Sequence, residues 1–456
     1  MTRKPKVVLY NPRAVFYTMP LALVALASAL DRANVDVVIV DGRLERDPER
    51  AVVEAARGAV CLGVTVLTGA PIRDAIAVSR AVKAAEPSCQ VVWGGWHPSL
   101  FARECLEEPC VDSVVTGQGE GAFRSLVERL IDGGEIEPVL SRPMVDLNTL
   151  PAHDYSLIPV ERYFALKQAR QVDYVSSQGC RFRCAFCADP AVFARGWSGL
   201  SPERIAEELS FLHAQYAIAD VAFQDETFFT QAARVDAFAG ELLTRQLPIT
   251  WTATLRADQA CRLSNGVFGK AVRSGLRRVM VGVESGSAEM LKRLNKDMTI
   301  DQVRRTAELC TQHGVGAIFN FIIGFPGESE SEMQATLALA KDLRRSNRAF
   351  ETPIFYYRPY PGNAMAEAAA SEGYEFPRGL EAWADFDYVG GRGPWVTAEQ
   401  WRRVERLKFY LRHAWTPGVW RWPLRASAQW RCRNDWYDFP IEKMLADMVR
   451  PPQQVS

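Results

Sequence analysis

The sequence has no excess of charge of either sign and no long apolar run. Lys and Arg number 54, and Asp and Glu also number 54, in 456 residues. Bulk electrostatics therefore does not favour a polyanion, and we expect no nucleic-acid partner. The longest apolar stretch near the N-terminus, residues 19–30, is shorter than the roughly 18–20 residues that a membrane span needs, and it has no small-residue cleavage site. We therefore expect a cytoplasmic protein without a membrane span.

The composition fits neither a disordered chain nor a disulfide-stapled one. Hydrophobic residues make 48% and charged residues 24% of the chain, as in folded globular proteins. At roughly 100–200 residues per domain, this length predicts two to four domains. Three of the 10 cysteines lie between Cys180 and Cys187, and such tight clustering in an intracellular protein indicates metal ligation.

Residues 1–135 alternate strand-length apolar runs with longer helical stretches, a pattern that predicts a parallel sheet with crossover helices. The strands are nearly continuous in Val and Ile, as expected when both sheet faces are covered. This region is predicted to form a Rossmann-like α/β domain. Its expected strands are residues 7–10, 35–40, 58–66 and 90–93, and its expected helices include residues 19–30 and 72–85.

Residues 136–171 break this rhythm with glycines and scattered prolines, which predicts a linker between domains. A second β/α series follows over residues 172–365. Six strand–helix units indicate a partial (β/α)6 barrel of the TIM type, open on one side, with its chemistry at the carboxyl ends of the strands. The expected strands are residues 173–176, 220–224, 249–254, 278–283, 317–323 and 353–358.

Residues 366–456 are rich in tryptophan and predict a small, mostly helical C-terminal domain. This last portion holds eight of the 12 tryptophans: Trp383, Trp395, Trp401, Trp415, Trp420, Trp422, Trp430 and Trp436. One interpretation is a helical cap whose aromatic residues form a core of their own. The alternative is that they line a large, flat substrate pocket.

The strongest motif is Gly179-Cys180-Arg181-Phe182-Arg183-Cys184-Ala185-Phe186-Cys187, directly after a predicted strand. Three thiolates on one short loop can hold three irons of a [4Fe–4S] cluster and leave the fourth iron open for substrate chemistry. A structural cluster or a zinc site normally takes four protein ligands, and no fourth cysteine follows at the usual spacing. The motif therefore favours a catalytic cluster over zinc.

This spacing, at this point of a β/α series, resembles the radical S-adenosylmethionine (SAM) superfamily. The resemblance implies that Cys180, Cys184 and Cys187 ligate the cluster and that Phe186 packs near the adenine of SAM. In that family the open iron binds the amino and carboxylate groups of SAM. One electron from the cluster then cleaves a carbon–sulfur bond and gives a 5′-deoxyadenosyl radical, which takes hydrogen from an unactivated carbon.

Later strand ends continue the resemblance. The matching segments are residues 224–228, 254–256, 282–286, 321–328 and 358–362. By this resemblance Glu284 and Ser285 are candidates to hydrogen-bond the ribose or methionine part of SAM, with a plain strand-end cap as the alternative. Arg256 is a candidate partner of the SAM carboxylate, or it neutralises Asp258 at the surface.

Two departures from the family pattern affect the SAM site. The usual Gly-Gly-Glu motif on the second strand is absent, and Asp225 and Glu226 stand in its place. We carry Asp225 as the candidate SAM contact there. The fifth strand also differs from the family pattern, so Ile322 is assigned only a hydrophobic contact with adenine.

The first domain resembles the cobalamin-binding domain of B12-dependent radical SAM enzymes. The resemblance implies a cobalamin site at the carboxyl edge of the sheet, where glycine lets backbone approach a bulky cofactor and threonine offers hydroxyls to its nucleotide loop. The candidate contacts are Asn11, Thr65, Thr68, Gly94, Gly95, His97, Gly117 and Gly119.

The sequence lacks the usual motif whose histidine binds cobalt from below. The Asp-x-His-x-x-Gly sequence of cobalamin mutases is missing, because the loop after the first strand begins Asn11-Pro12-Arg13. His97 is the histidine at the predicted edge, and a hydrogen bond to the corrin rim or a turn-stabilising role is favoured over ligation of cobalt. The absence of Gly-x-Gly-x-x-Gly after the first strand disfavours a nicotinamide or flavin site.

The sequence thus predicts a cobalamin-dependent radical SAM enzyme with a [4Fe–4S] cluster, SAM and cobalamin as cofactors. We expect a methyltransferase that acts on an unactivated carbon of a small molecule and takes electrons from a donor such as flavodoxin or ferredoxin. An alternative within this architecture is a non-methylating cyclase or rearrangement enzyme, like the anaerobic magnesium-protoporphyrin monomethyl ester cyclase. A third, non-catalytic alternative is a cobalamin sensor.

Overall fold

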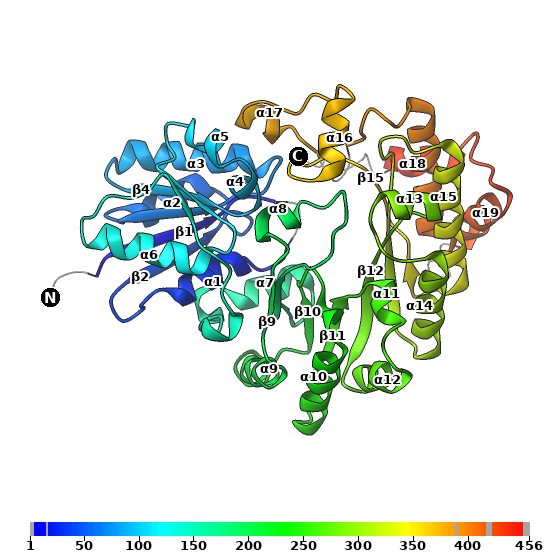
Figure 1. Cartoon of the computed structure of the whole chain (residues 1–456), viewed down its shortest axis with the longest axis horizontal. Helices are drawn as coiled ribbons and strands as arrows, with labels where there is room; N and C mark the ends of the chain where they lie inside the picture. The colour runs from blue at the N-terminus through cyan, green and yellow to red at the C-terminus, as the bar shows by residue number, and fades with distance from the viewer. Residues whose placement is uncertain (1–3, 15–16, 388–390, 416–421, 450–456) are drawn as a thin grey trace.

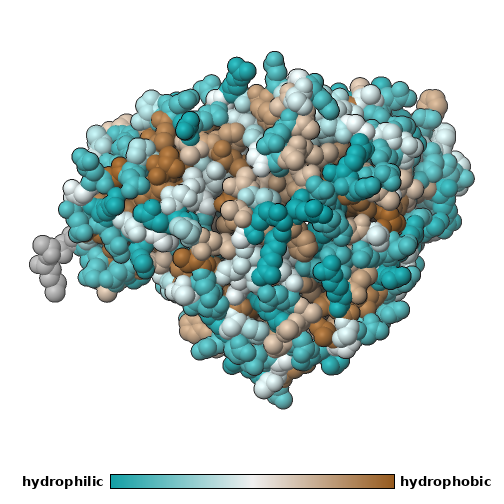
Figure 2. Space-filling view, viewed as in Figure 1, coloured by the Kyte–Doolittle hydropathy of each residue, from teal (hydrophilic) through white to brown (hydrophobic). Residues whose placement is uncertain are grey.

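A computed structural model of the chain describes residues 4–14, 17–387, 391–415 and 422–449. Two parallel sheets lie side by side, each with its own helices, and helix α8 (Asp189–Phe193) lies between them (Figure 1). The space-filling view from the same side shows hydrophilic residues over most of this face, with apolar residues in small groups between them (Figure 2). Within the described ranges, no helix is long and apolar enough to cross a membrane.

The first sheet has six parallel strands in the order β2-β1-β3-β4-β5-β6. Consecutive residues of β1 point to opposite faces and are all buried: Val8 and Tyr10 join one apolar cluster, and Val7 and Leu9 join another. Both faces are therefore covered, as the sequence predicts. The strands are β1 (Lys6–Asn11), β2 (Asp36–Asp41), β3 (Cys61–Thr65), β4 (Gln90–Gly94), β5 (Ser113–Thr116) and β6 (Val139–Ser141).

Helices α1 and α6 contact each other beside this sheet, and α2 contacts α3. The expected helices at residues 19–30 and 72–85 correspond to α1 and α3, whereas α2 was not predicted. The helices of this unit are α1 (Leu21–Ala29), α2 (Pro48–Ala56), α3 (Pro71–Ala85), α4 (Trp96–Leu100), α5 (Ala102–Leu106) and α6 (Gly119–Ile131).

Strand β6 comes from the segment that the sequence predicts as a linker. Residues Val139–Ser141 pair in parallel with β5, so the first sheet extends beyond residue 135. Three short helices then lead to the second sheet: η1 (Leu147–Thr149), η2 (Tyr155–Leu157) and α7 (Val160–Lys167). The crossing segment is thus packed against both units rather than free of them.

The second sheet is a partial barrel with the strand order β14-β13-β12-β11-β10-β7, to which β15 adds beside β13. All of its pairings are parallel, and the six expected strands are all present. The predicted α/β fold class is therefore confirmed. The strands are β7 (Gln171–Tyr174), β10 (Asp220–Phe223), β11 (Thr250–Thr254), β12 (Leu276–Glu284), β13 (Gly316–Ile323), β14 (Phe350–Glu351) and β15 (Ile354–Tyr356).

The barrel helices begin at caps that the sequence marks. Ser201 accepts a hydrogen bond from the Arg204 backbone N–H, and Thr299 forms a reciprocal capping box with Gln302. The helices are α9 (Pro202–Tyr216), η3 (Phe228–Thr230), α10 (Ala232–Thr244), α11 (Ala257–Ala260), α12 (Asn265–Arg273), α13 (Ala288–Arg293), α14 (Ile300–Gln312) and α15 (Glu330–Ser346).

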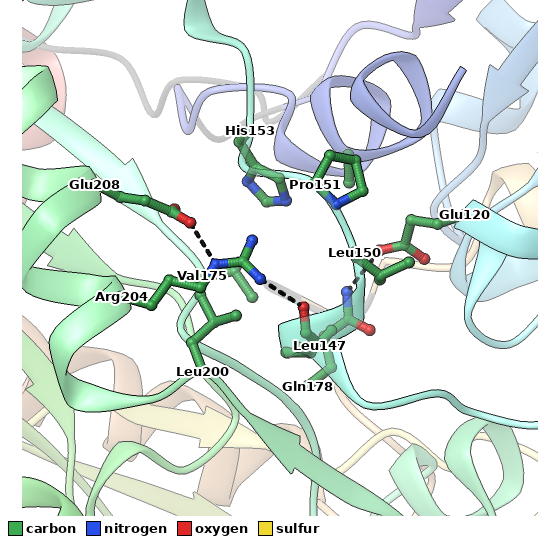
Figure 3. Close-up of a pocket in the computed structure, with 11 residues that line it drawn as sticks. Glu120, Leu147, Leu150, Pro151, His153, Val175, Gln178, Leu200, Arg204 and Glu208 are labelled. Carbon is green, nitrogen blue, oxygen red and sulfur yellow. Dashed lines mark hydrogen bonds and ion pairs between the residues drawn. The ribbon is translucent and has the colours of Figure 1, made fainter. Parts of the chain in front are cut away.

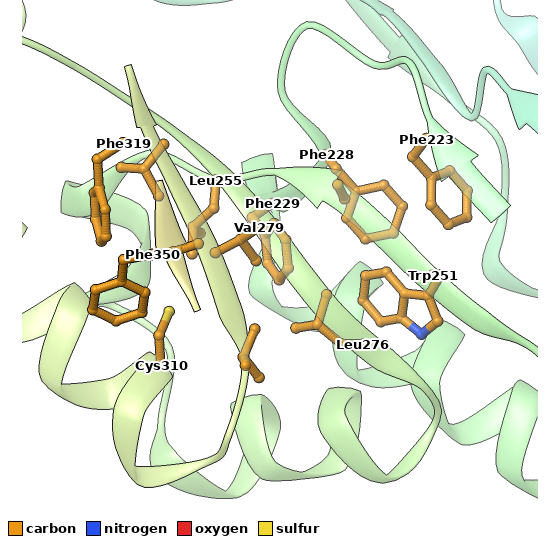
Figure 4. Packing of buried hydrophobic residues seen from close by; sticks show 14 of the residues in the cluster. Phe223, Phe228, Phe229, Trp251, Leu255, Leu276, Val279, Cys310, Phe319 and Phe350 are labelled. Atoms are coloured by element: carbon orange, nitrogen blue, oxygen red, sulfur yellow. The ribbon is translucent and has the colours of Figure 1, made fainter. Parts of the chain in front are cut away.

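Aromatic packing fixes the strands nearest the first unit. The rings of Phe228 and Trp251 lie 5.4 Å apart, and that of Phe223 lies 4.6 Å from Phe228 (Figure 4). All three side chains are fully buried, and such edge and tilted contacts add to the area that they remove from water. The ends of β10 and β11 are therefore rigidly placed beneath the candidate site.

The C-terminal segment divides between the two units and does not form a core of its own. Leu380 and Trp383 join the apolar cluster of the first unit, whereas Leu407 and Tyr410 join that of the barrel. The expectation of an independent aromatic core is therefore wrong, and Trp420 lies outside the described residues. The helices are α16 (Ala364–Ser371), α17 (Leu380–Ala384), α18 (Ala398–Ala414), α19 (Trp422–Asn434) and α20 (Ile441–Val449).

Candidate active site

The three clustered cysteines lie in a loop that closes on itself at its base. Strand β8 (Ser177–Gly179) pairs antiparallel with β9 (Trp197–Gly199) just outside this loop. Gly179 has φ +76°, and a Cβ added to it would lie 2.3 Å from the carbonyl oxygen of Gly196. Only glycine fits this neck, which holds both ends of the loop at the edge of the barrel.

The loop cysteines differ in exposure from most of the other cysteines. Cys180, Cys184 and Cys187 are partly exposed, whereas six of the remaining seven are buried in the two units. Partial burial raises the pKa of Cys180 to about 11 and that of Cys187 to about 12. A bound metal would favour the thiolate form of these cysteines, because metal binding releases the thiol proton.

Cys180, Cys184 and Cys187 stay the predicted ligands of a [4Fe–4S] cluster. Within the described part of the chain, no three His, Cys, Asp or Glu side chains converge as they would around one metal ion. Three ligands of a [4Fe–4S] cluster each bind a different iron, so their sulfurs need not converge on one point.

Arg256 borders this loop from the end of β11. Its Nη1 lies 3.6 Å from the Cys184 sulfur, and its guanidinium lies 3.7 Å above the ring of Phe182. Asp258 accepts a hydrogen bond of 2.9 Å from the same guanidinium, and this pair is buried rather than at the surface. The structure therefore contains the Asp258 pair, and it also places the Arg256 cation beside the cluster loop.

Glu284 and Ser285 end strand β12 but face protein partners. Glu284 has φ +66° and forms a buried ion pair of 2.7 Å with Lys296. The Ser285 hydroxyl lies 3.1 Å from that of Thr336 and is fully buried. Ser285 thus has the contacts of a strand-end cap, and Glu284 brings the Lys296 ammonium to within 5.7 Å of the Phe186 ring.

Asp225 and Glu226 are adjacent in sequence but have opposite environments. The Asp225 carboxylate is buried and accepts hydrogen bonds from the Ser176 N–H and from the hydroxyls of Ser176 and Ser177, at 2.6–2.7 Å. Its oxygens are taken up by these serines, so the structure does not place it toward a ligand. Glu226 instead faces the cavity between the two units. The neighbour of Asp225 is thus the site residue that sequence reasoning missed.

The Glu226 side chain is exposed and faces the cavity. Desolvation by the surrounding protein, together with the charges of Asp189 and Asp225, raises the pKa of Glu226 to about 8. At neutral pH the group therefore retains a proton for much of the time and can both donate and accept hydrogen bonds.

The two candidate adenine contacts lie against the same apolar group. Phe186 and Ile322 both pack against buried Met290, Leu294, Phe325 and Tyr357. The Phe186 and Phe325 rings lie 5.9 Å apart in an edge-to-face contact. The structure thus brings together two residues that are more than 130 positions apart in the sequence, next to the cluster loop.

A cavity of about 420 Å³ lies between the first sheet and the barrel. Six of the eight predicted cobalamin contacts line it: Asn11, Thr65, Gly94, Gly95, Gly117 and Gly119. The barrel contributes Val175, Gln178, Val192, Phe193, Gln224 and Glu226 to the same cavity. One chamber therefore touches both the carboxyl edge of the first sheet and the flanks of the cluster loop.

The glycines of this cavity fit a bulky cofactor. A Cβ on Gly63 would lie 2.7 Å from Leu9 and 3.2 Å from Phe123, so glycine lets these two side chains pack against the strand at the cavity wall. Gly95 has φ +96°, and its Cβ would lie 2.9 Å from the Thr65 hydroxyl. The recess is apolar inside and has backbone at its mouth, which suits the nucleotide tail and corrin rim of cobalamin.

Thr68 and His97 do not line this cavity, contrary to our expectation. Both are buried, the Thr68 Oγ1 lies 3.2 Å from His97 Nδ1, and the His97 ring packs against Phe101 and Trp383. Burial lowers the pKa of His97 to about 4. On helix α4 it is the neighbouring Trp96 that faces the cavity, so His97 has a packing role.

His153, from the crossing segment, is a cavity histidine that sequence reasoning missed. It lines the main cavity and also a side pocket of about 20 Å³, beside Arg204 and Glu208 (Figure 3). Burial lowers the pKa of His153, which keeps the imidazole neutral. A space of this size holds about one water, and its polar wall includes Glu120 and Gln178.

Comparison with known proteins identifies both units. The family model of the radical SAM superfamily matches residues 174–340, and that of the B12 binding domain matches residues 8–127. An uncharacterised methyltransferase of Pyrococcus horikoshii is 31% identical over 421 residues, which cover 86% of this chain and 88% of the relative.

Two further proteins are similar to this chain over most of its length. The anaerobic magnesium-protoporphyrin IX monomethyl ester cyclase of Rubrivivax gelatinosus is 26% identical, and the match covers 70% of this chain and 61% of the cyclase. The radical SAM methyltransferase TsrM from Kitasatospora setae, solved with tryptophan and a SAM analogue, has a TM-score of 0.67 at 18% identity and covers 81% of this chain and 76% of its own.

A B12-binding α/β unit that opens onto a radical SAM barrel defines one class of enzyme. The chain belongs to the cobalamin-dependent radical SAM enzymes, whose cofactors are a [4Fe–4S] cluster, SAM and cobalamin. The resemblance predicted from the sequence is thereby confirmed.

Proposed function

We propose that this chain is a methyltransferase that acts on an unactivated carbon of a small molecule. The observation that carries the proposal is one cavity that is lined by the edge of the B12-binding unit and by Gln178, Val192 and Phe193, which flank the cluster cysteines. When bound, the cluster and SAM supply a carbon-centred radical, and methylcobalamin supplies a methyl group. A substrate carbon inside one chamber can meet both, because proximity within an enclosed site is a large part of the rate enhancement.

The chain's own residues support this chemistry by binding and by excluding water. Phe186 and Ile322 offer an apolar contact to adenine, and Arg256 places a cation beside the cluster loop. Glu226 offers the cavity a carboxyl group that can hold a proton near neutral pH, which suits a hydroxyl or amine of the substrate. Leu23, Leu26 and Phe123 form the apolar wall of the inner recess.

The proposal extends to the surroundings of the enzyme. The chemistry needs an external one-electron donor, such as flavodoxin or ferredoxin, and a compartment that keeps the loop thiols reduced. We therefore place the protein in the cytoplasm. The relatives favour methyl transfer over ring formation, since the methyltransferase is matched over 88% of its length and the cyclase over 61%.

Labelled SAM tests the proposal. The reconstituted enzyme is incubated anaerobically with a reductant, candidate substrates and SAM that carries a labelled methyl group. Label in the product is the expected result. An unlabelled product formed together with 5′-deoxyadenosine would instead support the cyclase or rearrangement reaction, which the cyclase relative favours as second candidate.

A different measurement distinguishes an enzyme from a non-catalytic cobalamin sensor. Formation of 5′-deoxyadenosine by the reduced, SAM-supplied protein is expected of an enzyme, whereas a sensor with a vestigial barrel would form none even with candidate substrates present. The complete three-cysteine loop supports the enzyme.

A further inference from the structure

The cluster loop touches the cobalamin-binding unit at both of its ends. Gln178 lies two residues before Cys180, and its side-chain oxygen accepts a hydrogen bond of 2.9 Å from the Gln118 amide. Its own amide donates to the Glu120 carboxylate at 3.1 Å. Gln118 is the residue before α6 and Glu120 lies in the first turn of that helix, beside Gly117 and Gly119 at the cavity mouth. A chain of three polar side chains thus joins this turn to the start of the loop.

An aromatic contact joins the other end. Phe193, at the end of α8, meets Trp96 at the start of α4 with ring centroids 6.3 Å apart and planes at 84°. A Cβ on Gly117 would lie 3.3 Å from the Val192 carbonyl oxygen, so backbone also approaches closely here. Trp96 directly follows Gly94 and Gly95, the second pair of glycines at the cavity mouth.

Both contacts line the cavity itself. Gln118, Gln178, Trp96 and Phe193 all belong to its wall, together with Glu120. Gln118 and Glu120 are both buried. Gln118 accepts a further hydrogen bond of 2.7 Å from the Val145 N–H, and Glu120 is held by helix α6. The segments around Gly94–Gly95 and Gly117–Gly119, which carry predicted cobalamin contacts, are therefore also the segments that contact the cluster loop.

We propose that Gln178 and Phe193 are positioning residues that clamp the cluster loop to the cobalamin-binding unit and set the separation of cobalt from the open iron. Units joined by a linker move relative to each other unless their interface restrains them. A misplacement of about 1 Å can cost about 100-fold in rate when a group has to pass between two reactants. Gln178 and Phe193 both line the cavity between the two units, so a shift at either contact would change the separation of cobalt from the open iron.

This inference rests on the two cofactors of the family and not on methyl transfer. It is tested by the magnetic interaction between cob(II)alamin and the reduced cluster in the fully reconstituted protein, without any substrate. Because dipolar coupling falls with the cube of distance, the splitting of the two electron paramagnetic resonance signals reports the separation. A failure to find methyl transfer would therefore leave this measurement unaffected.

The sharpest variant is Gln178→Glu, which keeps the shape of the side chain but places a second carboxylate against Glu120. We expect the splitting to shrink and broaden, while iron content and corrin absorbance per chain stay as in the parent protein. Adding Glu120→Gln reverses the polarity of the hydrogen bond and is expected to restore the splitting. A second variant, Phe193→Ala, should shrink the splitting as well, and Phe193→Tyr should keep it.

Surface substitutions on helix α9 provide matched controls. Gln215→Glu and Phe211→Ala change the same residue types at exposed positions and should leave the splitting unchanged. An unchanged splitting in both Gln178→Glu and Phe193→Ala would overturn the proposal. So would a loss of iron from either variant, because the residue would then serve cluster assembly, and so would a double variant with Glu120→Gln that fails to recover.

Discussion

The two units meet at one cavity but build their edges from different materials. At the edge of the B12-binding unit, Gly63, Gly95 and Gly117 let protein atoms approach more closely than a Cβ would allow. Beside the cluster loop, the barrel instead carries charged side chains in buried pairs, such as Lys296 with Glu284. The two units thus differ in what shapes their sites, which is glycine backbone in the first and paired charges in the second.

The largest effect is expected where the barrel side depends on a covalent ligand. Cys184→Ala removes one of three thiolates, and we expect complete loss of the [4Fe–4S] cluster or of 5′-deoxyadenosine formation. Iron analysis and product analysis under anaerobic conditions measure this. Cys261→Ala, at an exposed cysteine outside the loop, is the control and should retain both. Cleavage of SAM by the Cys184 variant would contradict the ligand assignment.

The next largest effect is expected when a buried ion pair of the barrel is broken. Lys296→Met leaves the Glu284 carboxylate without its partner in a site where both side chains are less than 10% exposed. Loss of one member of such a pair costs about 3–5 kcal/mol in the free energy of unfolding. Lys443→Met breaks a partly exposed pair with Asp447 on helix α20 and should cost about 0–1 kcal/mol. Denaturant unfolding of both variants compares them, and equal effects would argue against a charge-dependent edge.

The cobalamin side is probed by adding a single methyl group. Gly95 has φ +96°, and an alanine there is strained and collides with the Thr65 hydroxyl. We expect Gly95→Ala to cost about 1–3 kcal/mol in the free energy of unfolding and, because it displaces the Thr65 hydroxyl at the cavity wall, to weaken cobalamin binding. Gly121→Ala, on helix α6 with nothing within 4 Å of the new Cβ, should bind cobalamin as the parent does. Equal affinities in a binding titration would show that the glycine backbone is not what receives the cofactor.

The smallest effect is a pH dependence. Burial and neighbouring carboxylates raise the pKa of Glu226 from 4.5 to about 8, so the folded protein binds more protons than the unfolded chain between these values. Stability from this group is full below pH 4.5 and is lost as the pH rises toward 8. In cofactor-free protein, Glu226→Gln should flatten the fall in unfolding free energy over this range. An unchanged slope would mean that Glu226 titrates normally.

Much of the barrel could be predicted because its signals are local. Alternating apolar runs and caps such as Thr299 with Gln302 mark strands and helices within a few residues. The cysteine motif is equally local, and it predicted the cluster loop and the family. Six of the predicted cobalamin contacts line the cavity for the same reason, since strand ends and glycine turns are visible in the sequence.

The remaining errors concern which way a side chain faces. Neither Asp225 nor Glu226 is marked by periodicity after the strand has ended, and only the Ser176 and Ser177 hydroxyls decide that Asp225 turns inward. His97 and Trp96 likewise share one helix turn, and the packing of Trp383 decides between them. His153 reaches the cavity through the path of the crossing segment, for which the sequence offers no signal.

The packing of the C-terminal segment was the hardest feature to predict, because its apolar side chains are buried against elements far away in the sequence. Helix α17 packs on α3, more than 290 residues earlier, while α18 packs on the barrel. An aromatic-rich helix looks the same in sequence whether it covers its own neighbours or a remote surface.

That remote packing has a consequence for biosynthesis. Leu380, Trp383 and Phe386 belong to the apolar cluster of the N-terminal unit, and Arg73 pairs with Asp385 across the same contact. A ribosome releases the first sheet long before these residues exist, so the nascent unit waits with an uncovered apolar face while the barrel is translated. Completion of the first unit is thereby delayed until the barrel, including the three-cysteine loop, has been translated.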